Sequence, residues 1–220
     1  MTRNSAALVH EACDEVGLVG SDLRGQLSRE IATQVLLRNC RDVVLLSGAT
    51  GVGKEKVAKA VHAAARLSLH RSGELVQVNC ANLGRGLFES ELFGYKRGAF
   101  TGADRDHEGL MAQAQNGTLV LDEIQSLEPA DQARLLRVLG EREYRAVGDE
   151  RVRTTNALLV LATNRDLREL VGQGLFRRDL YDRALAKIDI PSLYERRRDV
   201  GELAQLFVME AASELGPAEF

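Results

Sequence analysis

The sequence predicts an α/β fold, a three-layer α/β/α sandwich built around a mostly parallel five-stranded sheet. Two observations lead to this prediction. Short apolar runs alternate along the chain with longer segments in which apolar residues recur three or four positions apart. The short runs are almost wholly apolar, which is typical of parallel strands whose two faces are both covered by helices. A chain of 220 residues is long enough to form one such domain.

Each predicted element follows from its own pattern. The predicted strands are VVLLS (43–47), LVQVN (75–79), TLVLD (118–122), ALLVLA (157–162) and KIDI (187–190). The helical patterns between them span 54–70, 129–143 and 176–186, and a further helix is predicted over 199–214. The segment 141–154 is predicted to form a small hairpin that turns at Gly148–Asp149. Residues 1–17 are interpreted as a helical arm or linker, 18–215 as the α/β core, and 216–220 as a tail.

Composition narrows the classes of protein. The net charge of -3 and the pI near 5.9 give no reason to expect a nucleic-acid-binding surface. The basic stretch YERRRD (194–199) is interpreted as an ordinary charged face. Three widely spaced cysteines favour reduced thiols, and no apolar run approaches the roughly 18 residues that a membrane span requires. The expected location is therefore the cytoplasm, without membrane association.

The stretch LLSGATGVGKEKVAKA carries the strongest chemical signal. A predicted strand ends at Ser47, a glycine-containing loop follows, and Lys54 opens a helix, which is the arrangement that binds nucleotide phosphates. Backbone N–H groups of the loop curve around phosphate oxygens, and the lysine contacts the terminal phosphates. Glu55 stands where the general motif has a hydroxyl that helps to hold Mg²⁺. The predicted nucleotide-binding residues are Gly48, Ala49, Thr50, Gly51, Val52, Gly53, Lys54 and Glu55.

Polar residues end two other predicted strands. Asp122 and Glu123 follow TLVL, where one carboxylate can hold a metal ion and the other can orient or deprotonate water. Two solvated acids at a strand end are the plainer alternative. Thr163 and Asn164 end another strand, and they could either bind a γ-phosphate or simply cap the strand.

Two further stretches leave a structural and a functional interpretation open. Arg177 and Arg183 lie in a predicted helix and could either complete an active site across a subunit interface or form a solvated face. In GAFTGA (98–103), Phe100 and Thr101 stand between glycines. Such a segment is either a surface turn whose Phe100 packs inward or a loop that exposes Phe100 for a contact.

Taken together, these motifs resemble the central AAA+ ATPase domain of bacterial sigma-54-dependent transcriptional activators. The resemblance extends from about Leu18 to about Leu206, and GAFTGA is the signature hexapeptide of that family. The accompanying segments are VNCANL, ESELFGYKRGAFTGA, NGTLVLDEI, QARLLRVLGEREYRAVGDE, ATNRDL and FRRDLYDR, in the order and spacing of the family. A phosphate loop that ends in Gly-Lys-Glu is also typical of this family, which accounts for Glu55.

The resemblance implies ATP and Mg²⁺ as cofactors and a role for each matching residue. Lys54 and the loop would bind the phosphates, Asp122 would hold the metal ion, and Glu123 would act on water, restrained by Asn79. Thr163 and Asn164 would sense the γ-phosphate, and Arg177 and Arg183 would reach into the site of a neighbouring subunit in a ring, expected to be a hexamer. The residues implied to contact the sigma-54 factor are Gly98, Ala99, Phe100, Thr101, Gly102 and Ala103.

The sequence also departs from the family. Ser192, Tyr194 and Ala184 replace residues that are usual there, and this chain is expected to lack a DNA-binding segment and to lack the helical lid largely or wholly. An AAA+ protein of another clade, such as a helicase loader or unfoldase, is disfavoured by GAFTGA. A nucleotide-binding regulator that no longer hydrolyses ATP remains an alternative, although the acid pair and both arginines argue against it.

Overall fold

The computed structural model describes residues 5–36, 43–84 and 86–215. A five-stranded sheet forms its centre, with all neighbouring strands parallel in the order β2-β5-β8-β1-β9. Its strands are β1 (Val43–Ser47), β2 (Leu75–Asn79), β5 (Thr118–Asp122), β8 (Leu158–Thr163) and β9 (Ala186–Asp189). The predicted five-stranded parallel sheet is confirmed, and the bounds of β8 and β9 each differ by one residue from the prediction.

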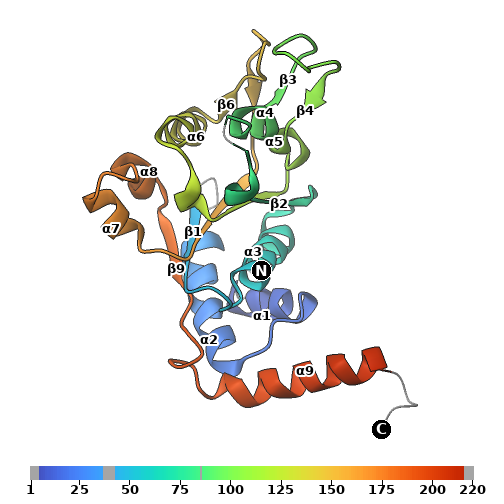
Figure 1. Ribbon diagram of the computed structural model, residues 1–220. Coiled ribbons are helices and arrows are strands. Elements are labelled where there is room, and N and C mark those ends of the chain that lie inside the picture. The colour runs from blue at the N-terminus through green and yellow to red at the C-terminus, as the bar shows by residue number, and fades with distance from the viewer. Residues whose placement is uncertain (1–4, 37–42, 85, 216–220) are drawn as a thin grey trace.

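Helices cover both faces of the sheet (Figure 1). On one face lie α1 (Ser5–Glu15), α2 (Ser21–Glu30), the π-helical turn η1 (Ile31–Leu36) and α3 (Lys54–Leu69). On the other face lie α4 (Phe88–Phe93), α5 (Leu110–Gln113), α6 (Pro129–Glu141), α7 (Leu167–Gly172) and α8 (Arg178–Arg183), with the short 3₁₀ turns η2 (Cys80–Asn82) and η3 (Ile124–Ser126).

Alternation along the strands explains this three-layer arrangement. Val44 and Leu46 of β1 point into the core that contains α1 to α3, whereas Val43 and Leu45 point into the core that contains α4 to α8. Both sets are buried, so the strand reads as a continuous apolar run.

The first helix is part of this packing. In α1, which lies within the predicted arm or linker, Val9, Ala12 and Cys13 are fully buried in the core against α3. The prediction of a helix in this segment is confirmed, and the apolar residues of the helix pack into the core of the domain. Part of the predicted arm, 1–4, and the predicted tail, 216–220, lie outside the described residues.

Two small antiparallel pairs stand beyond one end of the sheet (Figure 1). One joins β3 (Gly94–Tyr95) to β4 (His107–Glu108), and the loop between them contains 98–103. The other joins β6 (Glu143–Tyr144) to β7 (Arg153–Thr154) and is the predicted hairpin. Tyr95 pairs with Val147, which places the loop and the hairpin side by side.

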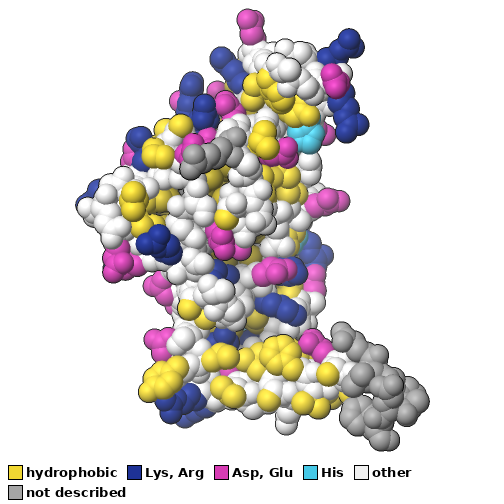
Figure 2. Space-filling view, in the orientation of Figure 1, with side chains coloured by type: hydrophobic (Ala, Val, Ile, Leu, Met, Phe, Trp, Pro, Cys, Tyr) yellow, Lys and Arg dark blue, Asp and Glu magenta, His cyan; other side chains and the backbone are white. Residues whose placement is uncertain are grey.

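The last helix, α9 (Asp199–Leu215), lies at the opposite end of the domain next to α2 (Figure 1). Figure 2 shows a row of hydrophobic side chains along it, and Phe207, Val208 and Met209 are all more than 60% exposed. Within the described residues, no helix is long and apolar enough to cross a membrane.

Candidate functional site

The carboxyl ends of β1, β5 and β8 form the candidate site. Because these three strands are parallel neighbours, the polar residues that follow them meet at one edge of the sheet. The loop after β1 begins with Gly48, whose N–H donates to the Thr163 carbonyl of β8 at 3.2 Å. The structure therefore brings together three of the motifs that the sequence places far apart.

The loop after β1 is held in the core by its valine, and a helix begins directly after the loop. Val52 is buried in the core, while Ala49, Thr50 and Gly51 are exposed. Gly53 has a φ of 99° and stands directly before α3. Such a left-handed backbone is accessible to glycine at little cost, and it turns the chain sharply into the helix N-terminus.

The Lys54 side chain lies across the loop. Its Nζ donates to the carbonyls of Gly48 at 2.8 Å and Ala49 at 2.9 Å. Burial lowers the pKa of the Lys54 ammonium, and the nearby negative charges of Asp122 and Glu123 oppose that shift. Lys54, Asn79 and Asp122 line a cavity of about 280 Å³ together with Glu55.

The acid pair at the end of β5 has an unusual backbone. Glu123 adopts a left-handed conformation, with φ 51° and ψ 46°, and its N–H donates to Asp122 Oδ1 at 2.8 Å. A residue other than glycine in this region carries a conformational cost, and such residues cluster at functional sites. Both side chains are half-buried.

A chain of hydrogen bonds joins the end of β8 to the loop. Thr163 is fully buried, and its Oγ1 donates to Gln125 Oε1 at 2.8 Å. Gln125 Nε2 donates to Asn164 Oδ1 at 2.9 Å, and Asn164 Nδ2 approaches Thr50 Oγ1 at 3.4 Å. Gln125 was not identified from the sequence, because a glutamine two residues after the acid pair has no distinctive spacing.

Two other predicted site residues have local partners. Asn79 stands opposite Asp122 in the sheet, but its Oδ1 accepts from Ala81 N–H at 2.8 Å, and no hydrogen bond joins it to Glu123 within the described chain. Glu55 is exposed and pairs with Lys59 at 2.7 Å.

Arg183 is the last residue of α8, which packs on α6, and Arg177 stands directly before that helix. Arg177 is exposed and pairs with Asp179, with a shortest separation of 2.7 Å. Arg183 is also exposed, and its Nη2 donates to the Leu139 carbonyl at 2.9 Å. Among the described residues, neither arginine contacts the loop 48–55 of its own chain.

The segment 98–103 folds into a compact turn. Gly98 N–H donates to the Ala103 carbonyl at 2.8 Å, and Ala103 is buried beneath the turn. The Phe100 ring packs edge-on against Tyr95 with centroids 4.9 Å apart, yet 42% of Phe100 is exposed. Thr101 is exposed at the tip.

The profile of the family described as "Sigma-54 interaction domain" matches residues 18–190. The chain belongs to this family. The resemblance inferred from the motifs is thus confirmed, as is the AAA+ P-loop fold.

Known members are similar over most of this chain. The Nif-specific regulatory protein of Azospirillum brasilense is 46% identical over 179 residues, which are 81% of this chain and 28% of that protein. The transcriptional regulatory protein ZraR of Escherichia coli (strain K12) is 44% identical over 200 residues, which are 90% of this chain and 44% of ZraR. The chain spans less than half the length of these curated relatives.

A solved protein structure has the same fold. The crystal structure of NtrX from Brucella abortus in complex with ADP superposes with a TM-score of 0.74 at 30% identity. That match covers 87% of this chain and 41% of the NtrX chain. A Sigma-54 interaction domain with this architecture is therefore the framework for the site described above.

Proposed function

We propose that this chain is the ATP-hydrolysing core of a sigma-54-dependent transcription activator. It would work in a hexameric ring and use the loop 98–103 to remodel the closed complex of sigma-54 RNA polymerase. The observation that carries the proposal is the meeting of the phosphate-binding loop, the acid pair and the polar end of β8 at one edge of the sheet.

The loop 48–55 would bind the ATP phosphates through its backbone N–H groups and the N-terminus of α3. Lys54 Nζ, which contacts two loop carbonyls in this structure, would turn to the phosphates and exchange two neutral acceptors for charged ones. The structure of NtrX in complex with ADP supports this assignment, because part of that chain shares the fold of this protein.

Asp122 fits the role of a magnesium ligand. Within the described residues, no group of three His, Cys, Asp or Glu side chains could enclose a metal ion. Mg²⁺ rarely needs such a group, since it is usually held by one or two carboxylates, phosphate oxygens and water. When bound, the ion supplies positive charge that offsets the charge on the phosphates.

Glu123 would orient the attacking water and accept its proton. The left-handed backbone and the bond from its own N–H to Asp122 fix the direction in which its side chain leaves the strand. Thr163, Gln125 and Asn164 would connect the γ-phosphate position to the end of β8 through their hydrogen bonds.

Completion of the site by a neighbouring subunit is the role we assign to Arg177 and Arg183. Both are exposed, at the two ends of α8, and their hydrogen bonds go to Asp179 and to the Leu139 carbonyl rather than to the phosphate loop of their own chain. An arginine delivered from outside stabilises charge in the transition state of phosphoryl transfer. Asn79, now bonded to Ala81, would have to change partners to restrain Glu123 in one nucleotide state.

The glutamate variant Glu123→Gln tests the hydrolytic part of the proposal. It should bind ATP with nearly unchanged affinity and lose hydrolysis by at least about a hundredfold, because the amide cannot accept the proton. Glu169→Gln, at an exposed position of α7, is the matched control and should remain active. Wild-type protein that binds ATP but hydrolyses none at any protein concentration would instead support the non-hydrolysing regulator.

A further inference from the structure

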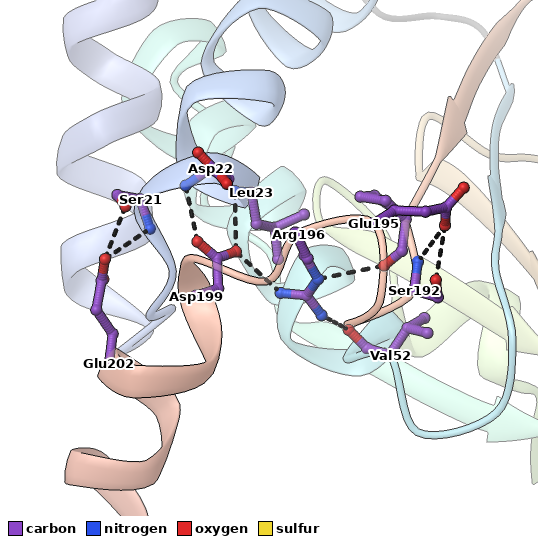
Figure 3. A network of polar contacts seen from close by, with 10 residues as sticks. Ser21, Asp22, Leu23, Val52, Ser192, Glu195, Arg196, Asp199 and Glu202 are labelled. Atoms are coloured by element: carbon purple, nitrogen blue, oxygen red, sulfur yellow. Dashed lines mark hydrogen bonds and ion pairs between the residues drawn. The ribbon is translucent and has the colours of Figure 1, made fainter.

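A buried arginine stands behind the phosphate-binding loop. In the stretch YERRRD, the sequence predicts a charged face, but Arg196 is only 4% exposed and Asp199 is fully buried. The prediction is wrong for these two residues, whereas Arg197 and Arg198 between them are exposed as expected. Figure 3 shows the polar network that this pair forms.

Arg196 spans three parts of the chain. Its Nη2 donates to the Val52 carbonyl of the loop at 2.7 Å, and its Nε donates to the Pro191 carbonyl at 3.2 Å. Its Nη1 pairs with Asp199 Oδ2 at 3.4 Å. The planar guanidinium therefore holds the loop, the segment after β9 and the first residue of α9 in one fixed arrangement.

Asp199 in turn caps α2. Its Oδ1 accepts from the Asp22 N–H at 2.8 Å and its Oδ2 from the Leu23 N–H at 3.1 Å. Gly20 stands beside it, and a Cβ at that position would lie 2.5 Å from Asp199 Oδ2. The carboxylate thus has two amides and one guanidinium as partners, which offsets the cost of burying its charge.

The bond to Val52 sets the orientation of a peptide group that faces the phosphate site. In a planar trans peptide the C=O and the following N–H point in opposite directions. Because Arg196 holds the Val52 carbonyl on the core side, the Gly53 N–H is directed to the other side of the loop. Within the described chain, that N–H donates to no protein acceptor. It is therefore an open donor at the N-terminus of α3, where an anion is favoured.

We propose that Arg196, anchored by Asp199, is a positioning residue that presets the Val52–Gly53 peptide for the phosphates of the nucleotide. Because Asp199 caps α2 and begins α9, the orientation of this peptide depends on the positions of both helices. A shift of either helix should therefore change the conformation of the phosphate loop, and a change in the loop should shift the helices. The inference rests on the proposed nucleotide-binding function and adds a residue that touches neither the phosphates nor the acid pair.

The test compares the ADP dissociation constant, measured by titration calorimetry, with the melting temperature of the protein without nucleotide. Arg196→Gln should raise the dissociation constant about tenfold. Without the arginine, the Gly53 N–H would no longer be oriented in the free protein and would have to be ordered when ADP binds. Arg197→Gln removes the same charge from an exposed neighbour that contacts Tyr194, and it should change the constant less than about twofold. Arg196→Lys, which keeps the charge but lacks the fork, covers the case in which the glutamine variant does not fold.

A readout at the loop separates positioning from general stability. In ¹H–¹⁵N spectra of the free protein, the Gly53 amide resonance should move in Arg196→Lys and stay in place in Arg197→Gln. Asp199→Asn should also raise the ADP dissociation constant. The double variant Arg196→Gln/Asp199→Asn should have a dissociation constant no higher than that of the single variant that binds ADP more weakly.

The outcomes distinguish the two levels of the proposal. If wild-type protein fails to bind ADP, the proposed function itself is wrong. If wild-type protein binds and a folded Arg196 variant binds equally well with only a lower melting temperature, Arg196 is merely structural and this inference is overturned.

Discussion

Gly148 of the β6–β7 hairpin lies directly against Ala99 of the loop 98–103, and a Cβ at Gly148 would come within 2.8 Å of the Ala99 Cβ. Lys96 N–H also donates to the Val147 carbonyl at 2.9 Å, and Val147 N–H donates to the Gly94 carbonyl at 2.9 Å. The hairpin and the loop therefore form one unit, so a change in the conformation of either should alter the conformation of the other.

The first prediction concerns this contact. Gly148→Ala adds a methyl group that must displace Ala99, and it also places alanine at a φ of 76°. We expect a loss of about 1–2 kcal/mol in the free energy of unfolding, measured by urea denaturation. Capture of sigma-54 should weaken while the ADP dissociation constant stays unchanged, because the phosphate loop is at a different edge of the domain.

Gly140→Ala is the control for that variant. Gly140 lies in α6, and a Cβ there meets nothing within 4 Å, so alanine should stabilise the helix by up to about 1 kcal/mol. Unchanged sigma-54 capture by a folded Gly148→Ala protein would contradict the coupling between hairpin and loop.

The second prediction concerns the tip of the loop. Thr101→Ala should abolish capture of purified sigma-54 in the presence of Mg-ADP and a metal-fluoride mimic of the transferring phosphoryl group. It should leave ADP affinity unchanged, since Thr101 is exposed and removed from the phosphate loop. Thr33→Ala makes the same chemical change in η1, where the hydroxyl donates to the Arg29 carbonyl, and capture should survive. Loss of ADP binding in Thr101→Ala would refute its assignment as a contact residue.

The third prediction separates the arginines of α8. Arg183→Ala should lower ATP hydrolysis roughly a thousandfold, because a finger arginine contributes that much to phosphoryl transfer. Its stability should fall by only about 1 kcal/mol through loss of the bond to the Leu139 carbonyl at the end of α6. Arg178→Ala removes an exposed ion pair with Asp182 on the same helix and should keep nearly full activity.

Mixing variants shows whether Arg183 acts across subunits. Protein carrying Arg183→Ala and protein carrying Glu123→Gln should each be inactive alone. Combined in one ring, an intact Glu123 of one subunit can meet an intact Arg183 of the next, so some hydrolysis should return. If no mixture recovers activity although mixed rings form, Arg183 acts within its own subunit or not at all.

The sheet could be predicted from the sequence because strands that are buried on both faces consist of consecutive apolar residues. The end of β8 was placed one residue short because Thr163 is polar, yet it pairs with Ser47 in the ladder and is fully buried. The helix α2 received no prediction, since Leu23 and Leu27 are its only apolar residues and Gly25 interrupts the pattern.

The motifs of the candidate site could be predicted from the sequence, whereas the residues that hold these motifs in place could not. Spacing predicts Lys54 and the acid pair as candidate site residues, because nucleotide chemistry demands particular residue types beside a strand end. It does not reveal Gln125 or Arg196, whose roles arise from contacts between distant segments. One of three consecutive arginines is buried only because the Val52 carbonyl and Asp199 are there to receive it.

The last prediction concerns pH. His62 of α3 is half-buried with its Nδ1 2.9 Å from Thr118 Oγ1 at the start of β5. Burial lowers the pKa of His62 below 6.5, and the positive charge of Arg66 lowers it further. Between the folded pKa and 6.5 the unfolded chain binds more protons, so the stabilising effect of a neutral His62 is complete above 6.5 and is lost as pH falls through this window.

His62→Gln keeps a polar group near Thr118 but cannot titrate. Urea denaturation of both proteins from about pH 8 to about pH 5.5 should show the wild type losing more stability on acidification than the variant. Because other groups titrate equally in both proteins, the difference between the two profiles isolates His62. Parallel profiles would mean that the His62 ring gains a proton in the folded protein as readily as in the unfolded chain, and that its burial behind Thr118 has no electrostatic consequence.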